Sequence, residues 1–189
     1  MTHSISAQGH TDEAIAERVQ AGETERFGEL VERYEAKLRR YIRRFVSDGE
    51  DSRDLLQDVF MKAYTNLRGF DTDRRFSPWI YRIAHNEVVN FLKRKRPEPF
   101  SLFDMDTLFP HLAAAETAEG PAARTEMRQL IDRSLDQLSV KYREPLILFY
   151  FDELDYQAIA DVLEIPVATV GVRLRRGRLM LRKFVEPFQ

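Results

Sequence analysis

The sequence predicts an all-α protein made of two small helical domains joined by a linker. Apolar residues recur at steps of three and four along most of the chain, which is the period of a helix buried on one side. No stretch shows the sustained apolar–polar alternation of a half-buried strand. Residues 97–124 contain four prolines and more acidic than basic side chains, a composition typical of a linker.

Composition excludes several classes of function. The 189 residues are 43% hydrophobic, which is enough for two small packed cores, and they include no cysteine. Disulfides, thiolate zinc sites and cysteine nucleophiles are therefore excluded. The first residues lack the apolar segment of a secretory signal, and no run approaches the roughly 18 apolar residues of a membrane span. We expect a cytoplasmic protein without metal or other cofactor.

The first domain is expected over residues 11–96 and begins with two long helices. One apolar stripe marks the first of them: Phe27, Leu30, Val31, Tyr34, Leu38, Tyr41, Ile42 and Phe45. Residues 47–49, with the sequence SDG, end this helix. The second helix covers about residues 51–67 and should bury Leu55, Val59, Ala63 and Leu67.

A third helix completes the first domain. Ser77 is expected as its N-cap, with Pro78 at the first helical position. Trp79 shares a stripe with Ile80 and Ile83, which favours a place in the core over a role as a stacking platform for bases. The helix ends in four consecutive basic residues, Lys93, Arg94, Lys95 and Arg96.

The linker and the second domain follow. Residues 97–124 also contain apolar side chains that are expected to dock on this chain's own domains: Phe100, Leu102, Phe103, Leu108 and Phe109. The second domain is expected over residues 125–189, and its first helix has an apolar stripe from Met127 to Leu138. The next helix contains Pro145, so it either starts late or kinks there.

The last part of the chain has the pattern of a helix-turn-helix. Asp155 is expected to cap a helix over 156–163, with Ile159, Ala160 and Leu163 buried, and Pro166 ends it. A second helix then runs from about 167 to 178 with Val167, Val170 and Leu174 turned inward. Its opposite face carries Thr169, Val172, Arg173 and Arg176. In a helix-turn-helix the second helix enters the DNA major groove, where arginine pairs with guanine edges and phosphates.

Positive charge is concentrated in two segments, although the net charge is only −2. The last 25 residues contain six basic side chains and one acidic one, and residues 82–96 contain five and one. The remainder is therefore strongly acidic. Local basic patches attract phosphate even on an acidic chain. An ordinary solvated arginine helix is the alternative; it is less favoured because the arginines lie on the helix that the turn projects.

These elements together resemble a known family. Four stretches, in this order, are similar to the extracytoplasmic-function sigma factors, the two-domain class of bacterial RNA polymerase sigma subunits: FGELVERYEAKLRRYIRRF, DSRDLLQDVFMKAYTNL, FSPWIYRIAHNEVVNFLKRKR and KYREPLILFYFDELDYQAIADVLEIPVATVGVRLRRGR. They span most of the chain outside the linker. The resemblance implies a sigma2-like first domain and a sigma4-like second domain.

The resemblance implies that the first domain binds the clamp helices of the polymerase β′ subunit. The matching positions are Asp51, Asp54, Gln57, Asp58 and Met61. Helical spacing places the three aspartates and Met61 on one face, opposite the apolar stripe of the same helix. An acidic face suits a basic partner helix. Magnesium is the alternative partner for clustered carboxylates, but consecutive turns spread these over roughly 10 Å.

The resemblance also implies that the first domain opens the promoter −10 element. Unstacked bases require aromatic walls, amide groups and positive charge, and residues 70–96 supply all three. Asn86 would contact a flipped base, with the loop Phe70–Phe76 closing the pocket. His85 either reaches DNA or lies on the surface. The remaining residues would follow the phosphates: Arg82, Lys93, Arg94, Lys95 and Arg96.

The second domain would read the −35 element through Thr169, Val172, Arg173, Arg175, Arg176 and Arg178. Gly171 and Val172 stand where the family often has a basic residue and a serine, so the base contacts differ in detail. An anti-sigma partner, often membrane-anchored, is typical of the family. Two other functions compete: a stand-alone helix-turn-helix regulator, which leaves the acidic face unused, and a metal-dependent enzyme acting on DNA.

Overall fold

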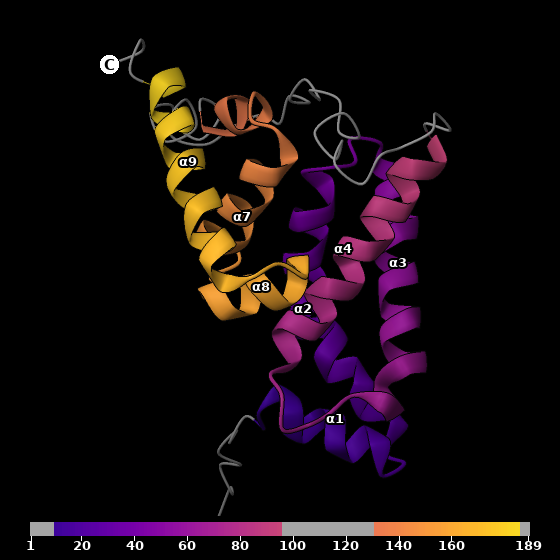
Figure 1. The fold of residues 1–189 in the computed structure, drawn as a ribbon. Coiled ribbons are helices and arrows are strands. Elements are labelled where there is room, and N and C mark those ends of the chain that lie inside the picture. The colour runs from indigo at the N-terminus through magenta and orange to yellow at the C-terminus, as the bar shows by residue number, and fades with distance from the viewer. Residues whose placement is uncertain (1–9, 96–130, 186–189) are drawn as a thin grey trace, which may run out of the picture.

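The computed structural model describes residues 10–95 and 131–185, and every regular element in these two ranges is helical (Figure 1). The all-α prediction is therefore confirmed for the described part of the chain. The linker, Arg96 and residues 125–130 lie outside the described ranges. The predictions that the linker docks on the domains and that the second domain begins at residue 125 therefore fall outside them as well. None of the described helices is long and apolar enough to cross a membrane.

The first domain is built on helices α1 (Asp12–Gln20), α2 (Phe27–Arg43), α3 (Gly49–Asn66) and α4 (Phe76–Lys95). As predicted, the stripes of α2 and α3 are buried against each other and against α4. The Asp48 carboxylate accepts hydrogen bonds from the backbone N–H groups of Glu50 and Asp51, at 2.8 and 3.0 Å, and so caps α3. Helix α1 lies across one end of the bundle (Figure 1).

Helix α4 starts earlier than the sequence predicts. It begins at Phe76, so Ser77 lies inside the first turn and is not its N-cap. A side chain distant in sequence supports this end of the helix: the backbone N–H of Phe76 donates to Glu13 Oε1 of α1 at 2.8 Å. Trp79 packs against Phe70 and Phe76, with ring centroids 4.9 and 5.3 Å away, which agrees with its expected place at the core.

The second domain contains a helical segment over residues 131–136, followed by α7 (Val140–Tyr150), α8 (Tyr156–Leu163) and α9 (Val167–Val185). Helix α7 begins before Pro145, so the alternative of a late start is wrong. Asp155 caps α8 as predicted, because its carboxylate accepts from the N–H of Ala158 at 2.8 Å. Glu164 then adopts a left-handed conformation, with φ 52°, and ends the helix ahead of Pro166.

Helix α9 is longer than expected and differs at its start. It continues to Val185, well beyond the predicted end at 178. Val170 and Leu174 are buried as predicted, but Val167 is 39% exposed, so its inward placement was wrong. Within α8, Leu163 was predicted to be buried but is only partly buried, whereas Val162, which was not among the predicted residues, is buried. Both differences arise at helix ends, where the turn geometry rotates side chains away from the ideal helical positions.

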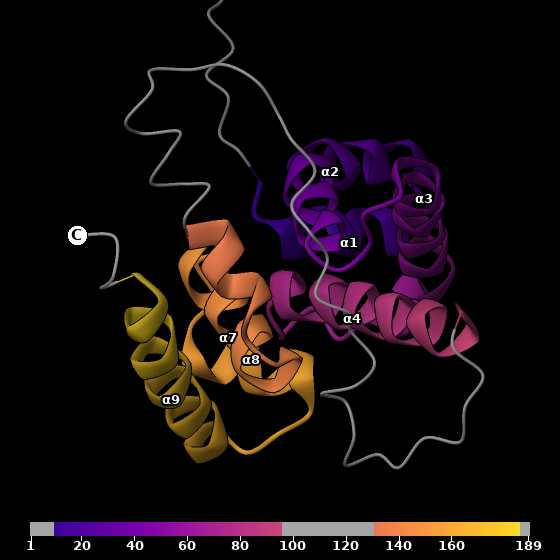
Figure 2. The ribbon, with the colours of Figure 1, turned by 90° about the horizontal axis from the view of Figure 1, so that it is seen from above.

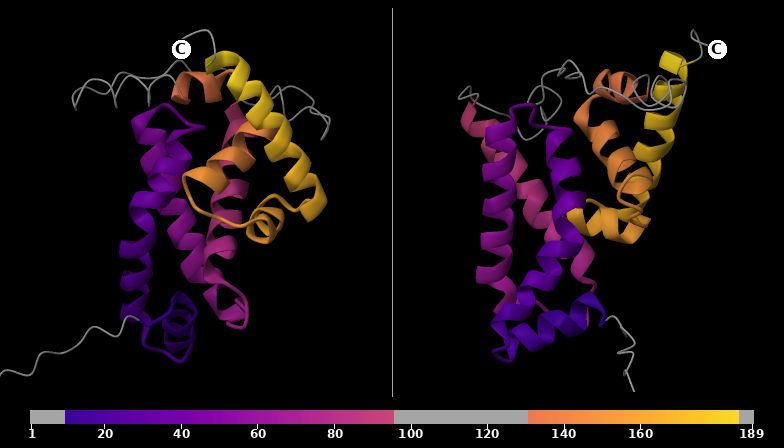
Figure 3. Two further views of the ribbon diagram at one scale, coloured as in Figure 1. Left: turned by 90° about the vertical axis from the view of Figure 1, so that its left-hand side faces the viewer. Right: turned by 180° about the vertical axis from the view of Figure 1, so that it is seen from behind.

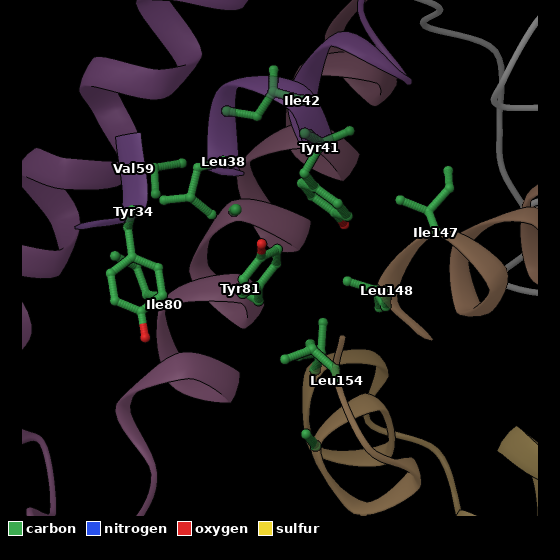
Figure 4. Close-up of a cluster of buried hydrophobic side chains, with 14 of the residues drawn as sticks. Tyr34, Leu38, Tyr41, Ile42, Val59, Ile80, Tyr81, Ile147, Leu148 and Leu154 are labelled. Carbon is green, nitrogen blue, oxygen red and sulfur yellow. The ribbon is translucent and has the colours of Figure 1, made fainter. Parts of the chain in front are cut away.

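The two domains pack directly on each other. Helix α8 lies alongside α4, and α7 faces α2 (Figures 2 and 3). Figure 4 shows Tyr41 and Tyr81 of the first domain lying across from Ile147, Leu148 and Leu154 of the second. All five of these residues are at most 3% exposed. The apolar core is therefore continuous between the domains, which the prediction of two domains joined by a linker did not include.

Candidate nucleic-acid interface

The predicted acidic face of α3 is open to solvent. Asp54, Gln57 and Asp58 are exposed, and Met61 is 60% exposed although it is apolar. Tyr64, one turn further, is 46% exposed, so the carboxylates lead into an exposed apolar patch. Asp51 differs from the others because it is half-buried and forms an ion pair with Lys95 of α4. The geometry places all five predicted residues on the side of α3 that faces away from its buried stripe.

A cavity of about 660 Å³ lies beside the N-terminal half of α4. Its first wall comes from the first domain and combines the aromatic rings of Phe70 and Trp79 with Arg74, Arg75 and Arg82. Its second wall comes from α8 and its N-cap and consists of Asp155, Gln157, Ala158 and Asp161, of which the two aspartates are carboxylates. Aromatic rings beside guanidinium groups are what an unstacked nucleic-acid strand requires.

The other predicted −10 residues lie further along α4, outside the cavity. Asn86 is exposed on α4, near the middle of the helix. Lys93, Arg94 and Lys95 are exposed at the C-terminal end of α4, where cations also interact favourably with the helix dipole. The −10 candidates therefore form a line along α4 that starts at Arg82 in the cavity and ends at this basic run.

His85 is the exception among these residues. Its side chain is only 12% exposed, and its Nδ1 lies 2.7 Å from Glu144 Oε1 in the second domain. The expectation that it is an ordinary surface residue is therefore wrong. Contact with DNA remains a prediction, and it requires the two domains to separate first.

Tyr41, His85 and Glu144 form a buried polar cluster between the domains, here called the domain latch. The Tyr41 hydroxyl donates to the Glu144 carboxylate at 2.5 Å. Burial lowers the pKa of His85, but the charge and the hydrogen bond of Glu144 raise it by more, so this pKa lies above its ordinary value. The charge of Glu164 also raises the pKa of His85, and the charge of Lys93 lowers it. Burial raises the pKa of Glu144, yet His85 and Tyr41 bring it below its ordinary value. The latch thus favours an imidazolium–carboxylate pair.

A second polar contact crosses the same interface. The Tyr81 hydroxyl donates to Asp152 Oδ1 at 2.7 Å, whereas the buried Asp152 Oδ2 has no hydrogen-bond partner. Burial raises the pKa of Asp152 to about 6, although the hydrogen bond from Tyr81 and the charge of Arg40 lower it. Each contact therefore contains one group whose pKa is raised when the domains are packed together, His85 in the latch and Asp152 in this contact.

The predicted recognition helix presents an arginine-rich face on the outside of the molecule. Arg175, Arg176 and Arg178 are exposed, as is Val172 at 49%, while Thr169 and Arg173 are half-buried. In Figures 1 and 2, α9 is the outermost helix of the second domain. Glycine at position 177 allows α9 to approach α7 closely, because a Cβ there would lie 2.9 Å from Leu146 Cδ1. A helix held this way can offer its free face to a DNA groove.

Sequence reasoning missed several residues of these sites. Arg74 and Arg75 were passed over, although adjacent arginines in a loop expected to close a base pocket were a usable signal. The role of Glu144 was also missed. A carboxylate next to proline in an apolar helix indicates an unusual environment, but its partners lie 59 and 103 residues away in the sequence. Among the described residues, no group of three potential metal ligands comes together.

Comparison with known proteins assigns the two domains to families. Sigma-70 region 2 matches residues 30–98, and Sigma-70 region 4 matches residues 128–181. The chain is 31% identical over 172 residues to the ECF RNA polymerase sigma factor SigW of Bacillus subtilis, covering 88% of this chain and 92% of that protein. It is 34% identical over 184 residues to the ECF RNA polymerase sigma-E factor of Escherichia coli, covering 94% and 95%.

A solved structure agrees with these relatives. The structure of CnrH in complex with the cytosolic domain of CnrY has a TM-score of 0.70 and 27% identity, and it covers 94% of this chain and 99% of that one. The fold and the two matched regions thus define a sigma factor of the sigma-70 type. The chain belongs to the extracytoplasmic-function sigma factors and is a promoter-recognising subunit of RNA polymerase. Members of this family are initiation factors and not enzymes.

Proposed function

We propose that the chain binds core RNA polymerase through the acidic face of α3 and recognises promoter DNA through α4 and α9. The observation that carries this proposal is the separation of the surfaces. The acidic face belongs to α3, whereas the arginine face belongs to α9, and these helices lie on opposite sides of the molecule (Figure 1). Polymerase bound to α3 and DNA bound to α9 therefore do not compete for one surface.

The acidic face suits the polymerase clamp helices of the β′ subunit. Its exposed carboxylates offer charge to a basic partner, and the exposed Met61 and Tyr64 supply apolar area beside them. Interfaces of this kind combine a desolvated apolar centre with a polar rim that sets orientation and association rate. We assign Asp51, Asp54, Gln57, Asp58 and Met61 to this contact.

The downstream promoter element is assigned to the first domain. The loop Phe70–Phe76 would close the pocket for an unstacked base, Asn86 would contact the base edge, and the arginines would hold the backbone. The basic run at the end of α4, with Lys93, Arg94, Lys95 and Arg96, would follow the strand. His85 joins this surface only when the domain latch is open.

The upstream element is assigned to α9. Arg173, Arg175, Arg176 and Arg178 supply base-edge and phosphate contacts, and Thr169 and Val172 lie on the same outward face. Gly171 removes a phosphate contact that is frequent in the family, so we expect upstream binding to depend more strongly on the remaining arginines.

Catalysis is assigned to the core polymerase, and this chain is proposed to act without a cofactor of its own. An anti-sigma factor is proposed as a further partner, since CnrH was solved with the cytosolic domain of CnrY. We expect such a partner to act in the cytoplasm. A stand-alone regulator is not favoured, because it would use neither the acidic face nor the aromatic–arginine cavity.

Charge reversal on α3 tests the assignment of the polymerase contact. The double variant Asp54→Lys, Asp58→Lys should lose co-purification with core polymerase while its helical circular dichroism stays unchanged. The matched control is Glu17→Lys, Glu32→Lys, which makes the same change in net charge at exposed positions on α1 and α2. The control should bind core as the parent does. A folded Asp54/Asp58 variant that still binds core polymerase fully would overturn the assignment.

A further inference from the structure

Helix α1 bonds to both ends of the loop that is proposed to close the base pocket. This loop, Phe70–Phe76, is here called the pocket loop. At its first end, the side-chain amide of Gln20 donates to the carbonyl oxygens of Leu67 and Phe70, both at 2.8 Å. At its second end, Glu13 Oε1 accepts from the backbone N–H of Phe76, also at 2.8 Å. The two α1 residues are seven positions apart, so they lie on one face of the helix.

The chemistry of the two side chains fits the backbone groups that they bind. The pocket loop begins at the end of a short 3-10 turn, Leu67–Gly69, where carbonyl oxygens accept bonds from outside the helix. A primary amide has two N–H donors, and Gln20 gives one to each of the two carbonyls. The loop ends where α4 begins, and the first N–H groups of a helix need acceptors, which Glu13 provides. Each side chain therefore supplies the kind of group that its end of the loop requires.

Helix α1 is itself fixed on the first domain. Ile15 and Ala16 on its inner face are fully buried. At its start, Asp12 accepts from two side chains of α2: the Tyr34 hydroxyl donates to Oδ2 at 2.5 Å, and the Arg33 guanidinium donates to Oδ1 at 2.6 Å. These contacts join α1 to α2, so α1 is a fixed support for the pocket loop.

The middle of the pocket loop is exposed, whereas its ends are buried. Phe70 and Phe76 are 6% and 0% exposed, with ring centroids 5.5 Å apart. Asp71, Asp73 and Arg74 between them are exposed. The hydrogen bonds within this exposed part are local, since the N–H groups of Asp73 and Arg74 both donate to Asp71. Local bonds shape the loop, but its position on the domain is set at its ends, by the two rings and by the bonds from α1.

We propose that Gln20 and Glu13 are positioning residues for the downstream promoter element, because they hold the pocket loop in the geometry that reads an unstacked base. This inference rests on the proposed function of the loop. Both residues precede the Sigma-70 region 2 match, which begins at residue 30. A recognition site must be held to within about 0.5 Å of its productive geometry. Release of either end of the loop should therefore weaken discrimination between bases more than attraction to phosphates, which carries no sequence information.

The first test uses Trp79, the only tryptophan of the chain, and does not need polymerase. Its ring packs against both end rings of the pocket loop, with centroids 4.9 and 5.3 Å away, so its emission reports on both ends. Gln20→Met removes the donor and Glu13→Met removes the acceptor at similar size. Each variant should increase quenching of Trp79 by acrylamide while helical circular dichroism stays unchanged. Quenching equal to that of the parent in both variants would overturn the proposal.

Two controls separate the hydrogen bond from other effects of these changes. Glu13→Gln loses the charge but keeps an oxygen acceptor, so it should behave as the parent does. Glu17→Met makes the same change as Glu13→Met at an exposed position of the same helix. It should leave the quenching of Trp79 unchanged. Equal quenching in Glu17→Met and Glu13→Met would show that the bond to the loop is not the cause, which contradicts the proposal.

The second test measures base discrimination with core polymerase, on a selected promoter and on derivatives with single changes in either element. A mismatched base pair costs a specific protein–DNA complex roughly tenfold in affinity. For Gln20→Met and Glu13→Met, discrimination at the downstream element should fall to about twofold, whereas discrimination at the upstream element, assigned to α9, should equal that of the parent. Equal losses at both elements, or no loss at either, would overturn the proposal. A parent chain without downstream discrimination would refute the proposed function of the loop itself, and this inference with it.

Discussion

Replacing Gly177 of α9 by alanine should destabilise the second domain, although alanine is the better helix former. An added Cβ would lie 2.9 Å from Leu146 Cδ1 and 3.1 Å from the carbonyl oxygen of Tyr142. Leu146 is 1% exposed, so its side chain has no free space to turn into, and the carbonyl belongs to the backbone of α7. Helices α7 and α9 would have to move apart.

The expected magnitude follows from two opposing contributions. Overpacking a well-packed site costs about 1–3 kcal/mol, whereas replacing glycine inside a helix gains about 1 kcal/mol. The net loss for Gly177→Ala is therefore up to about 2 kcal/mol in the free energy of unfolding. Gly171 in the same helix is the matched control, because a Cβ there meets only Tyr156 Cε2, at an ordinary 3.6 Å. Gly171→Ala should stabilise by up to about 1 kcal/mol.

Thermal unfolding of the whole chain, followed by circular dichroism, measures both variants against the parent. For a chain of this size, 1 kcal/mol corresponds to a shift in Tm of about 2–4 °C. We expect shifts of opposite sign, downward for Gly177→Ala and upward for Gly171→Ala. An upward shift of similar size for both variants would refute the close approach of α7 and α9.

Two further predictions concern the contacts between the domains. Packing of the two domains raises the pKa of His85 above 6.5 and that of Asp152 to about 6, so the stabilisation from these two groups is lost as pH rises through the raised values. It lowers the pKa of Glu144, whose contribution is present above the ordinary value of 4.5 and is lost as pH falls through the lowered one. With labels attached at the exposed positions Ala36→Cys on α2 and Ala168→Cys on α9, energy transfer between the domains should therefore fall between about pH 5 and 8, and a transfer that rises over this range would contradict the sign. Tyr81→Phe leaves the half-buried Asp152 carboxylate without its donor, which should cost about 1–3 kcal/mol of unfolding free energy at pH 8 and less at pH 5, where Asp152 is protonated. An equal loss of unfolding free energy at both pH values, measured by urea unfolding, would show that the missing donor to the ionised Asp152 carboxylate is not the cause.

Local patterns were sufficient to predict most of the helices. The cap of α8 by Asp155 and the buried stripes of α2 and α3 depend only on residues within a few positions of one another, and these predictions are confirmed. The errors lie at helix ends. Ser77 resembles a cap, but Glu13 from α1 bonds to the start of α4, and the helix begins at Phe76, two residues before the predicted first position Pro78. Tertiary contacts of this kind override local signals.

The candidate sites could be predicted where their residues lie on one face of a single helix. Spacing alone groups the aspartates and Met61 of α3 on one face and the arginines of α9 on another, because residues on one face of a helix are neighbours in space. The assignment of the α3 face to polymerase came from the resemblance to sigma factors. The cavity and the domain latch could not. Glu144 meets Tyr41 and His85 across the domain interface, and neither periodicity nor composition indicates which distant side chains pair.

The central claim is that this chain directs core polymerase to a promoter that neither recognises alone. Its most direct test is run-off transcription in vitro from a promoter selected out of a random duplex library, with core polymerase alone, with the chain alone, and with both together. The account predicts promoter-specific transcripts and permanganate-reactive thymines at the downstream element only when both are present. Tight, sequence-selective duplex binding by the chain alone, with no change in transcripts or reactivity when core polymerase is added, would contradict it.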